Sequence, residues 1–345
     1  MKGPNLFLFA TTGLVAASTT TSATVHVNVS LDNGGFWRVP ITPLTRFGSD
    51  TITAFAIIDI AGAYGFNHVI LDQESIGLGP IADGYSIGEG VVVPATSVRT
   101  HPFTAPIETY ADFRSTPRAS IGLAFDSPFA RTFDNFIIAP RDTQSSLLVL
   151  NPETPAQYAY NGQWSYVNSS EPDYPNVMAS VVVGNETFAS EVFSLLSAVE
   201  QVGIPHEAFR AIVRHLESAG FIISGDDTRI AGTDPSSIES GRRVFIQGNL
   251  QEWGFESLRI PGLSAAQLAQ VLPPIYFDVV SSTHETVVRL ELLPEDYIDA
   301  RFQEIHVIAK RAGECTIGTS LLRRVGIHID SRNRRIGFAE PVDEI

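Results

Sequence analysis

Apolar residues in this chain gather in short stretches of strand length, in which they alternate with polar residues or run continuously. Such stretches recur along most of the chain, with Gly, Pro, Asn, Asp and Ser between them: TVHVNVSL, TITAFAIIDI, FNHVILD, GVVVPA, RASIGLAF, SSLLVLN, NVMASVVVG, RVFIQG, PPIYFDVV, TVVRLELL, EIHVIAK, RVGIHID and RRIGFAE. A period of two residues is typical of strands, and the separating residues favour turns. The pattern therefore predicts an all-β chain built of sandwiches or barrels rather than βαβ units.

Helical periodicity is confined to the second half of the chain. EVFSLLSAVEQVG (191–203) and PHEAFRAIVRHLESAGF (205–221) place apolar residues at i, i+3, i+4 and i+7, and SAAQLAQVL (264–272) is a shorter candidate. The second of these segments begins at Pro205 and stops at Gly220, which are favoured residues for a helix start and a helix end. We predict a short helix in each segment.

A polar, turn-rich stretch near the middle of the chain is the best candidate for a junction between domains. It reads NPETPAQYAYNGQWSYVNSSEPDYP and covers residues 151–175. Clusters of Pro, Asn, Ser and Gly are typical of connecting segments. We therefore expect an N-terminal β lobe over residues 24–152 and a C-terminal β lobe over residues 153–345, both within the usual domain range.

The first 23 residues have the character of a secretory signal. A single Lys2 precedes an apolar run from Leu6 to Ala17, and small residues follow to Ala23. This run is too short for a stable membrane span. The sequence predicts a secreted, extracellular protein. Three acceptor triplets for N-glycosylation agree with secretion, and we expect them on exposed turns that carry glycans; they begin at Asn28, Asn168 and Asn185.

The composition excludes several classes of function. The 345 residues carry a formal charge of −15, and the only lysines are Lys2 and Lys310. Such a surface repels phosphate backbones and anionic lipids, so we expect neither nucleic-acid nor membrane binding. Cys315 is the only cysteine, which rules out an intramolecular disulfide, and its apolar context predicts an inert buried thiol. His206 and His215 share no helix face, and no metal-binding or phosphate-binding motif occurs, so no metal and no cofactor are expected.

Two segments resemble parts of the pepsin-like aspartic proteases. IDIAGAYGFNHVILDQES (58–75) resembles the segment that leads to the first catalytic aspartate, and TIGTSLLRRVGIHIDSRNRRIGFAEP (316–341) resembles the C-terminal segment of the family. SIGLAF, VMASVVVGNETF and LPPIYFDV resemble further family segments in the right order. The resemblance implies an all-β, bilobal pepsin-like fold, with two β lobes of the six-strand type, a few short helices and a peptide-sized cleft between the lobes.

The resemblance also assigns candidate site residues. Asp72 falls on the first aspartate, but Gln73 and Glu74 replace the hydroxyl residue and the glycine that normally follow it. In ASEVFSLLSAVE (189–200), Ser194 and the two leucines after it match the end of the second loop, which puts Ser190 on the second aspartate to within one or two residues. Ser194 is also a candidate for substrate binding, as is Tyr85, which resembles the tyrosine of the flap over the cleft.

Two interpretations of function follow. Catalysis in this family needs two carboxylates that share a proton and activate one water. Neither Asp-Thr-Gly nor Asp-Ser-Gly occurs in the chain. The first interpretation is a proteolytically inactive, secreted monomer that binds a peptide or a secreted protein partner in the interlobe cleft. The alternative is an active aspartic endopeptidase with an unorthodox pair, Asp72 and Glu191.

Overall fold

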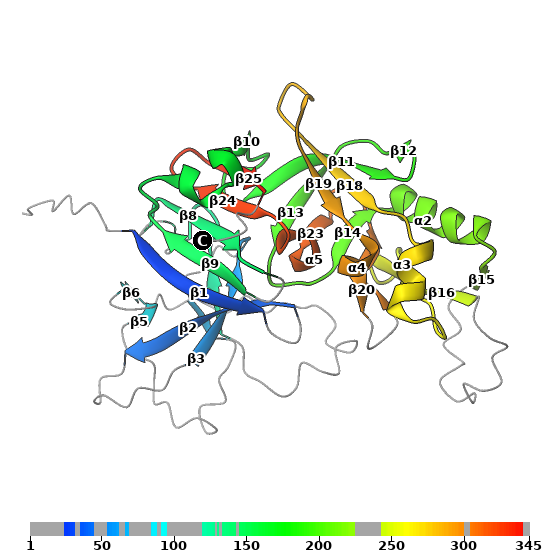
Figure 1. Cartoon of the computed structure of the whole chain (residues 1–345), viewed down its shortest axis with the longest axis horizontal. Helices are drawn as coiled ribbons and strands as arrows, with labels where there is room; N and C mark the ends of the chain where they lie inside the picture. Colours follow the sequence, from blue (N-terminus) through cyan, green and yellow to red (C-terminus); the bar gives the residue numbers. More distant parts are fainter. Residues whose placement is uncertain are drawn as a thin grey trace, which may run out of the picture.

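The computed structural model contains two curved β-sheets that lie side by side, with short helices packed mainly on the second (Figure 1). This arrangement confirms the expected all-β, two-lobed architecture. The structure describes residues 24–31, 35–44, 54–61, 66–68, 84–87, 91–94, 119–127, 130, 133–142, 145–224, 243–299 and 304–340. Among these residues, no helix is both long and apolar enough to cross a membrane.

The first sheet is built mainly from the N-terminal half of the chain. Its strands are β1 (Val25–Leu31), β2 (Trp37–Leu44), β3 (Ala54–Asp59), β4 (Phe66–His68), β5 (Gly84–Ile87), β6 (Val91–Pro94), β7 (Ala119–Gly122), β8 (Asn135–Pro140), β9 (Ser145–Leu150), β10 (Ser165–Asn168), β24 (Gly326–Asp330) and β25 (Arg335–Ala339). They follow the order β10-β25-β24-β8-β9-β1-β2-β3-β7-β4, and β5 joins β2 to β6.

The second sheet is built from the middle of the chain. Its strands are β11 (Asn176–Val183), β12 (Glu186–Thr187), β13 (Glu191–Leu196), β14 (Val202–Pro205), β15 (Ile222–Ser224), β16 (Arg243–Asn249), β17 (Phe255–Arg259), β18 (Ile275–Val280), β19 (Thr286–Leu292), β20 (Ile298–Asp299), β21 (Glu304–Ile305), β22 (Val307–Lys310) and β23 (Cys315–Gly318). The main order is β15-β16-β17-β22-β14-β23-β13-β11-β18-β19.

The end of the chain returns to the first sheet. Strand β24 pairs with β8, and β25 pairs with both β24 and β10. In Figure 1 these last strands lie beside β8 and β10. The two sheets are therefore not separated at one point of the chain, and the expected C-terminal lobe of residues 153–345 contributes three strands to the first sheet.

The described helices are short and agree with two of the three predicted segments. They are α2 (His206–Ser218), α3 (Ala265–Val271), α4 (Pro294–Tyr297) and α5 (Thr319–Leu322), with 3-10 turns η3 (Pro155–Tyr158) and η4 (Tyr160–Gly162). Helix α2 begins directly after Pro205 and buries one apolar face, and Ser264 and Gln267 form a capping box at the start of α3.

The predicted helix over residues 191–203 is wrong. This segment forms β13, a turn and β14 instead. Within β13 the more buried residues recur every second position, at Phe193 and Leu195. The strand lies between β11 and β23, so pairing on both sides satisfies its backbone groups and overrides the local helical pattern.

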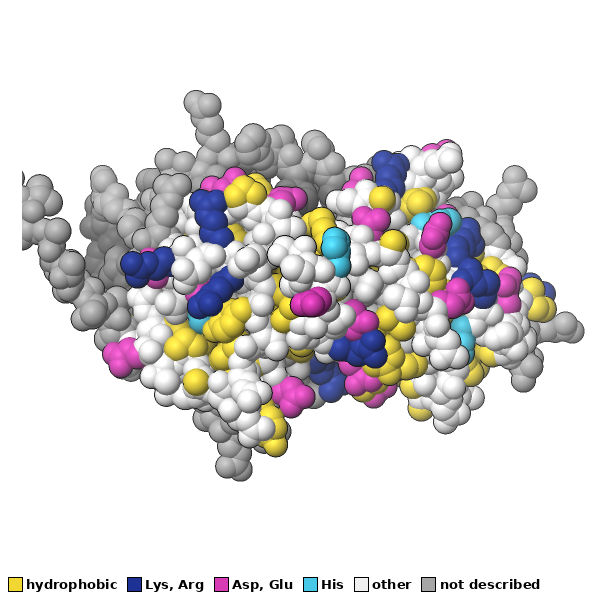
Figure 2. Space-filling view, turned by 90° about the horizontal axis from the view of Figure 1, so that it is seen from above, with side chains coloured by type: hydrophobic (Ala, Val, Ile, Leu, Met, Phe, Trp, Pro, Cys, Tyr) yellow, Lys and Arg dark blue, Asp and Glu magenta, His cyan; other side chains and the backbone are white. Residues whose placement is uncertain are grey.

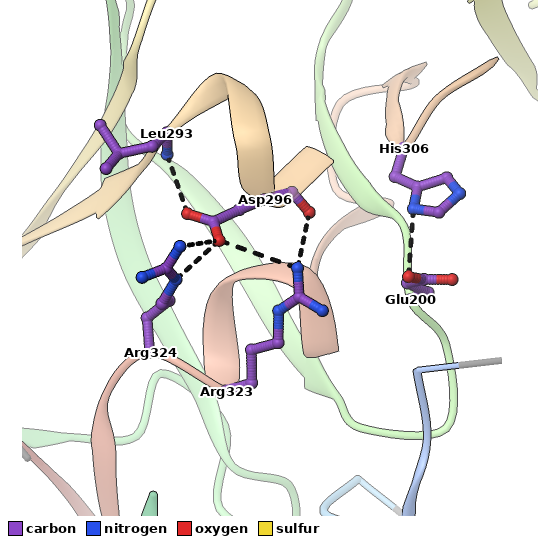
Figure 3. Close-up of polar contacts among 6 residues, drawn as sticks. All are labelled: Glu200, Leu293, Asp296, His306, Arg323 and Arg324. Carbon is purple, nitrogen blue, oxygen red and sulfur yellow. Dashed lines mark hydrogen bonds and ion pairs between the residues drawn. The ribbon is translucent and has the colours of Figure 1, made fainter. Parts of the chain in front are cut away.

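A buried aspartate fixes the short helices of the second lobe beneath this strand. The side chain of Asp296, on α4, is only 2% exposed, and its Oδ1 accepts a hydrogen bond from Arg324 Nε at 2.6 Å. Arg323 Nη2 donates to the Asp296 carbonyl at 3.1 Å and lies 3.7 Å from the same Oδ1. The Leu293 backbone N–H donates to Oδ2 at 3.3 Å (Figure 3). Both arginines directly follow α5, so these contacts join α4 to α5.

We expect Asp296→Asn to lower the free energy of unfolding by about 2 kcal/mol. Removing one charge of an ion pair whose two members are both buried costs more than about 2 kcal/mol. The cost is smaller here because Arg324 is 41% exposed, so water can hydrate its guanidinium group once the carboxylate is gone. Glu186→Gln is the matched control, because Glu186 and its partner Arg214 are both more than half exposed. Urea unfolding measures both variants, and an Asp296→Asn protein as stable as the control would contradict this role.

Candidate functional site

Each sheet contains a parallel strand pair whose first strand ends at the other lobe. In the first sheet β3 runs parallel to β7, and its last residue, Asp59, lies opposite Gly122. In the second sheet β13 runs parallel to β23, and its last residue, Leu196, lies opposite Gly318. In both pairs the second-last residue of the first strand, Ile58 or Leu195, lies opposite an isoleucine of the partner strand. Asp59 and Leu196 therefore occupy equivalent positions in the two lobes.

The turns after these two strands meet through one hydroxyl. Ser197 Oγ donates to the Ile58 carbonyl at 2.6 Å and accepts from the Ile60 backbone N–H at 2.8 Å. Ser197 and Ile60 are fully buried, and Ile58 nearly so. The residue equivalent to Ser197 in the first lobe is Ile60, whose side chain has no hydroxyl. The reciprocal contact from the first lobe to the second is therefore impossible, and the lobes are joined here from one side only.

Asp59 brings a carboxylate to this contact. Its side chain is half-buried, and its Oδ1 accepts from the Ala61 backbone N–H at 3.2 Å. The carbonyl of Asp59 accepts from Leu123 N at 2.8 Å, which ties the strand end to the segment after β7. The local hydrogen bonds thus fix the backbone on both sides of the carboxylate.

At the equivalent position of the second lobe, Leu196 has an aliphatic side chain without a carboxyl group. The acidic residues nearest to it along the chain are Glu191 and Glu200. Glu191 opens β13, and five residues of extended strand separate it from Leu196 by about 16 Å. Glu200 follows the turn, and its Oε1 lies 3.3 Å from His306 Nδ1 (Figure 3). At this strand end, the described residues of the second lobe place no carboxylate in the position that mirrors Asp59.

The chain after the Ser197 turn is held against the start of α5. The backbone N–H of Thr319 donates to the Val199 carbonyl at 2.9 Å, and Ser320 N donates to the Glu200 carbonyl at 3.2 Å. A Cβ on Gly318 would lie 2.7 Å from the carbonyl oxygens of Val199 and Glu200. Only glycine allows this approach, so the sequence TIG before α5 directly positions the turn that carries Ser197.

The two lobes also touch at Gly35, just before β2. Its φ of +75° is one that glycine adopts without strain. A Cβ at this position would lie 2.8 Å from Cδ of Glu200, so the backbone of the first lobe packs directly on the Glu200 carboxyl group. The two lobes are therefore in close contact both at Ser197 and at Glu200, which lies three residues later.

The structure describes three of the four residues that the sequence suggested for the active site. Asp72 lies outside the described residues. Ser190 is exposed and precedes β13, about 20 Å of extended chain before Leu196, so it does not reach the contact between the lobes. Tyr85 is on β5, paired with Pro43 and Val93. Ser194 is half-buried within β13.

Sequence reasoning missed Asp59, although the signal was present. The segments IIDIA and SLLSA each follow an apolar strand, and their parallel partners read SIGL and TIGT. This internal likeness aligns Asp59 with Leu196 and Ile60 with Ser197. The match to the family's first segment was instead extended past Asp59 to the later apolar run that ends at Asp72.

The three glycosylation candidates are all exposed, but only one lies on a turn. Asn185 is in the turn between β11 and β12, as expected. Asn28 lies within β1, where it accepts a hydrogen bond from Arg141 at 3.1 Å, and Asn168 ends β10. Alternation along each strand points these two side chains to solvent.

The remaining titratable chemistry of the described residues offers no second centre. Cys315 is buried on β23, and burial raises the pKa of its thiol to about 12, so it is not a nucleophile at neutral pH. No group of three or more metal-ligating side chains occurs among the described residues. On the face seen in Figure 2, acidic and basic side chains are interspersed rather than gathered by sign.

Comparisons with known proteins establish the fold. No protein-family profile and no curated protein matches the sequence. Among solved structures, the chain is similar to an aspartic proteinase from Irpex lacteus with a TM-score of 0.55 and 14% sequence identity. The similarity covers 92% of this chain and 98% of the proteinase chain. At this identity the likeness establishes the pepsin-like fold and nothing about activity.

We expect Ser197→Ala to weaken the contact between the lobes. The substitution leaves the Ile58 carbonyl and the Ile60 N–H buried without their partner, which costs about 1–3 kcal/mol. Ser197→Thr keeps a hydroxyl at the same place and is the matched control. Urea unfolding followed by fluorescence and by circular dichroism should give a lower midpoint for the alanine variant alone. Equal midpoints for the two variants would rule out the hydroxyl as the link.

Proposed function

We propose that this protein is a non-proteolytic member of the pepsin fold, secreted, and used for binding a peptide or a protein. One observation carries the proposal: the strand end that mirrors Asp59 in the second lobe is Leu196. We further propose that Asp59, rather than Asp72, occupies the first aspartate position, and that Leu196, rather than Ser190, occupies the second.

Peptide hydrolysis by this fold requires two carboxylates in contact. One is ionised and acts as general base on the water, and the other is protonated and donates to the peptide carbonyl. Their proximity is what separates their two proton affinities. Leu196 can neither donate nor accept a proton, so the residue that mirrors Asp59 cannot act as the second carboxyl group.

The residues after each strand end support the same conclusion. Pepsin-like proteases carry a hydroxyl residue and then a glycine at these positions. Here Ile60 and Ala61 follow Asp59, and Ser197 and Ala198 follow Leu196. One hydroxyl of the two is kept, and both glycines are replaced. The Ser197 hydroxyl provides the link between the lobes, whereas the groups that would activate water are incomplete. These replacements support a fold that is retained for binding and not for catalysis.

The binding role rests on what the chain keeps. The lobes still meet through a buried hydroxyl and through Gly35, which suits a fold whose two halves hold a fixed relative position. Secretion is supported by the apolar leader over residues 6–17 and by the exposed positions of Asn28, Asn168 and Asn185. A peptide or secreted protein, bound between the lobes of a monomer without a metal or cofactor, is the partner that we propose.

The alternative of an active Asp72–Glu191 pair gains no support. Glu191 lies at the start of β13, on the side of the strand remote from Ser197. A slip of one or two residues in the second loop cannot bridge the offset of five positions from Glu191 to Leu196.

Proteolysis assays test the proposal directly. The mature protein is incubated with a denatured substrate protein from pH 2 to pH 7, with and without a pepstatin-type inhibitor. We expect no inhibitor-sensitive cleavage at any pH, because the loss of one general acid–base partner alone lowers the rate by about 10²–10⁴. Asp59→Asn is the control variant and should behave as the wild type does. Inhibitor-sensitive cleavage by the wild-type protein that Asp59→Asn abolishes would overturn the proposal.

A further inference from the structure

One continuous segment packs on part of the first sheet. Residues 155–168, here called the clasp, comprise η3, η4 and β10. Tyr158 and Trp164 from the clasp pack on a small apolar cluster that is separate from the main core; its sheet residues are Ile137, Ala139, Leu147 and Val149. Figure 1 shows β10 beside β25 and β24, at the edge of this sheet. The clasp leads through residues 169–175 into β11, the first strand of the second sheet.

Two tyrosine–histidine hydrogen bonds fasten the clasp to the sheet. Tyr158 Oη lies 2.6 Å from Nε2 of His26 on β1. Tyr166 Oη lies 2.8 Å from Nδ1 of His328 on β24. Within the clasp, Trp164 Nε1 donates to the Pro155 carbonyl at 2.9 Å. The Tyr160 backbone N–H donates to the Glu340 carbonyl near the chain end at 3.0 Å. Both tyrosine hydrogen bonds thus depend on an imidazole, and they add to the backbone pairing of β10 with β25.

His328 is enclosed by the clasp. Its side chain is 3% exposed, and its Nε2 has no hydrogen-bond partner among the described residues. The rings of Trp164 and Tyr166 meet its imidazole edge to face, with centroids at 5.5 and 5.6 Å. On the other side, His328 lies opposite Ile137 in the sheet register. The imidazole is therefore surrounded by apolar and aromatic groups.

The rings of the clasp lie directly on the sheet backbone. A Cβ on Gly337, which pairs with both His328 and Tyr166, would lie 2.7 Å from the Tyr166 ring and 3.1 Å from the Trp164 ring. Glycine is required here for the close approach. While the clasp is closed, little space is left for water to reach the imidazole.

Two charged groups act on His328, and they oppose each other. Asp330, on the same strand, favours a positive imidazole, and Arg335 on β25 disfavours it. Arg335 stacks on the Tyr166 ring at 4.2 Å and donates to Asp330 Oδ2 at 2.7 Å. Asp330 also accepts from Asn333, so its charge is largely satisfied elsewhere. Burial is the dominant effect and lowers the pKa of His328 to about 4.

We propose that residues 155–168 form an acid-released clasp, which is closed on the sheet while His328 is neutral and opens when His328 takes up a proton. A protonated imidazole in this enclosure is a buried cation without a carboxylate in direct contact. Opening lets water hydrate it and detaches Tyr166 and Trp164 from β24 and β25. This inference does not depend on the proposed function.

The direction of the pH effect follows from proton linkage. An exposed histidine has a pKa of about 6.5, so the open state binds protons more tightly than the closed state. The closed clasp is therefore most favoured above pH 6.5, and it loses stability as the pH falls from 6.5 to about 4. Over that interval the opening equilibrium can rise by up to roughly 300-fold.

Hydrogen exchange of the whole protein tests the clasp. Amide protection over residues 155–168 is measured at pH 6.5 and pH 4, after correction for the intrinsic exchange rate, with α2 as the internal reference. We expect protection of the clasp to fall by tenfold or more at pH 4 relative to α2. His328→Gln, which is neutral at both pH values, should lose less than threefold. His215→Gln, at an exposed position of α2, should behave as the wild type does.

The wild-type protein alone also provides a decisive measurement. The titration of the His328 imidazole, followed by nuclear magnetic resonance, should have the same midpoint as the opening of the clasp. Equal protection at pH 6.5 and pH 4 would overturn the proposal. So would a His328→Gln protein that loses as much protection as the wild type, or an opening midpoint that is unrelated to the His328 titration.

Discussion

The hydroxyl of Ser197 is the contact on which the rest of the arrangement depends. It joins the turn after β13 to the backbone on both sides of Asp59, and it does so in a fully buried position. Buried backbone groups need partners, so this one side chain fixes how the two strand ends face each other. Gly318 and the residues after it then hold the turn itself, and the buried Asp296 holds α5 through the two arginines that follow it.

The same contact explains how the fold can be preserved in a protein that we propose to be non-proteolytic. The parallel pairs β3–β7 and β13–β23 keep their register, and the likeness to an aspartic proteinase extends over nearly the whole chain. Fold and catalysis place different demands on these turns. The fold needs a hydroxyl that bridges the lobes and a glycine opposite each strand end, and both are present. Catalysis needs a second carboxylate, and we propose that Leu196 occupies its position.

The sequence predicted the architecture better than the site. Alternating apolar residues are a local signal, and strands such as β11 and β18 could be predicted from it. The segment EVFSLLSAVEQVG fits a helical period equally well, and only its pairing with β11 and β23 makes it a strand. The second loop was placed at Ser190 for a separate reason, because Ser194 and the two leucines after it match the end of the family motif. The sequence favoured Asp72 for the first aspartate position because a match by spacing was available. The equivalence of Asp59 and Leu196, on which our proposal for Asp59 rests, appears only once the partner strands are known.

The titration of the Asp59 carboxyl group tests the central claim most directly. Carbon-13 resonances of this group are followed by nuclear magnetic resonance in the wild type and in Leu196→Asp. Because a leucine occupies the position that mirrors it, we expect Asp59 to titrate in one unsplit step in the wild type. In Leu196→Asp it should titrate in two coupled steps, because adjacent carboxylates share a proton. A two-step titration already present in the wild type, or a Leu196→Asp protein in which Asp59 titrates as before, would contradict the account.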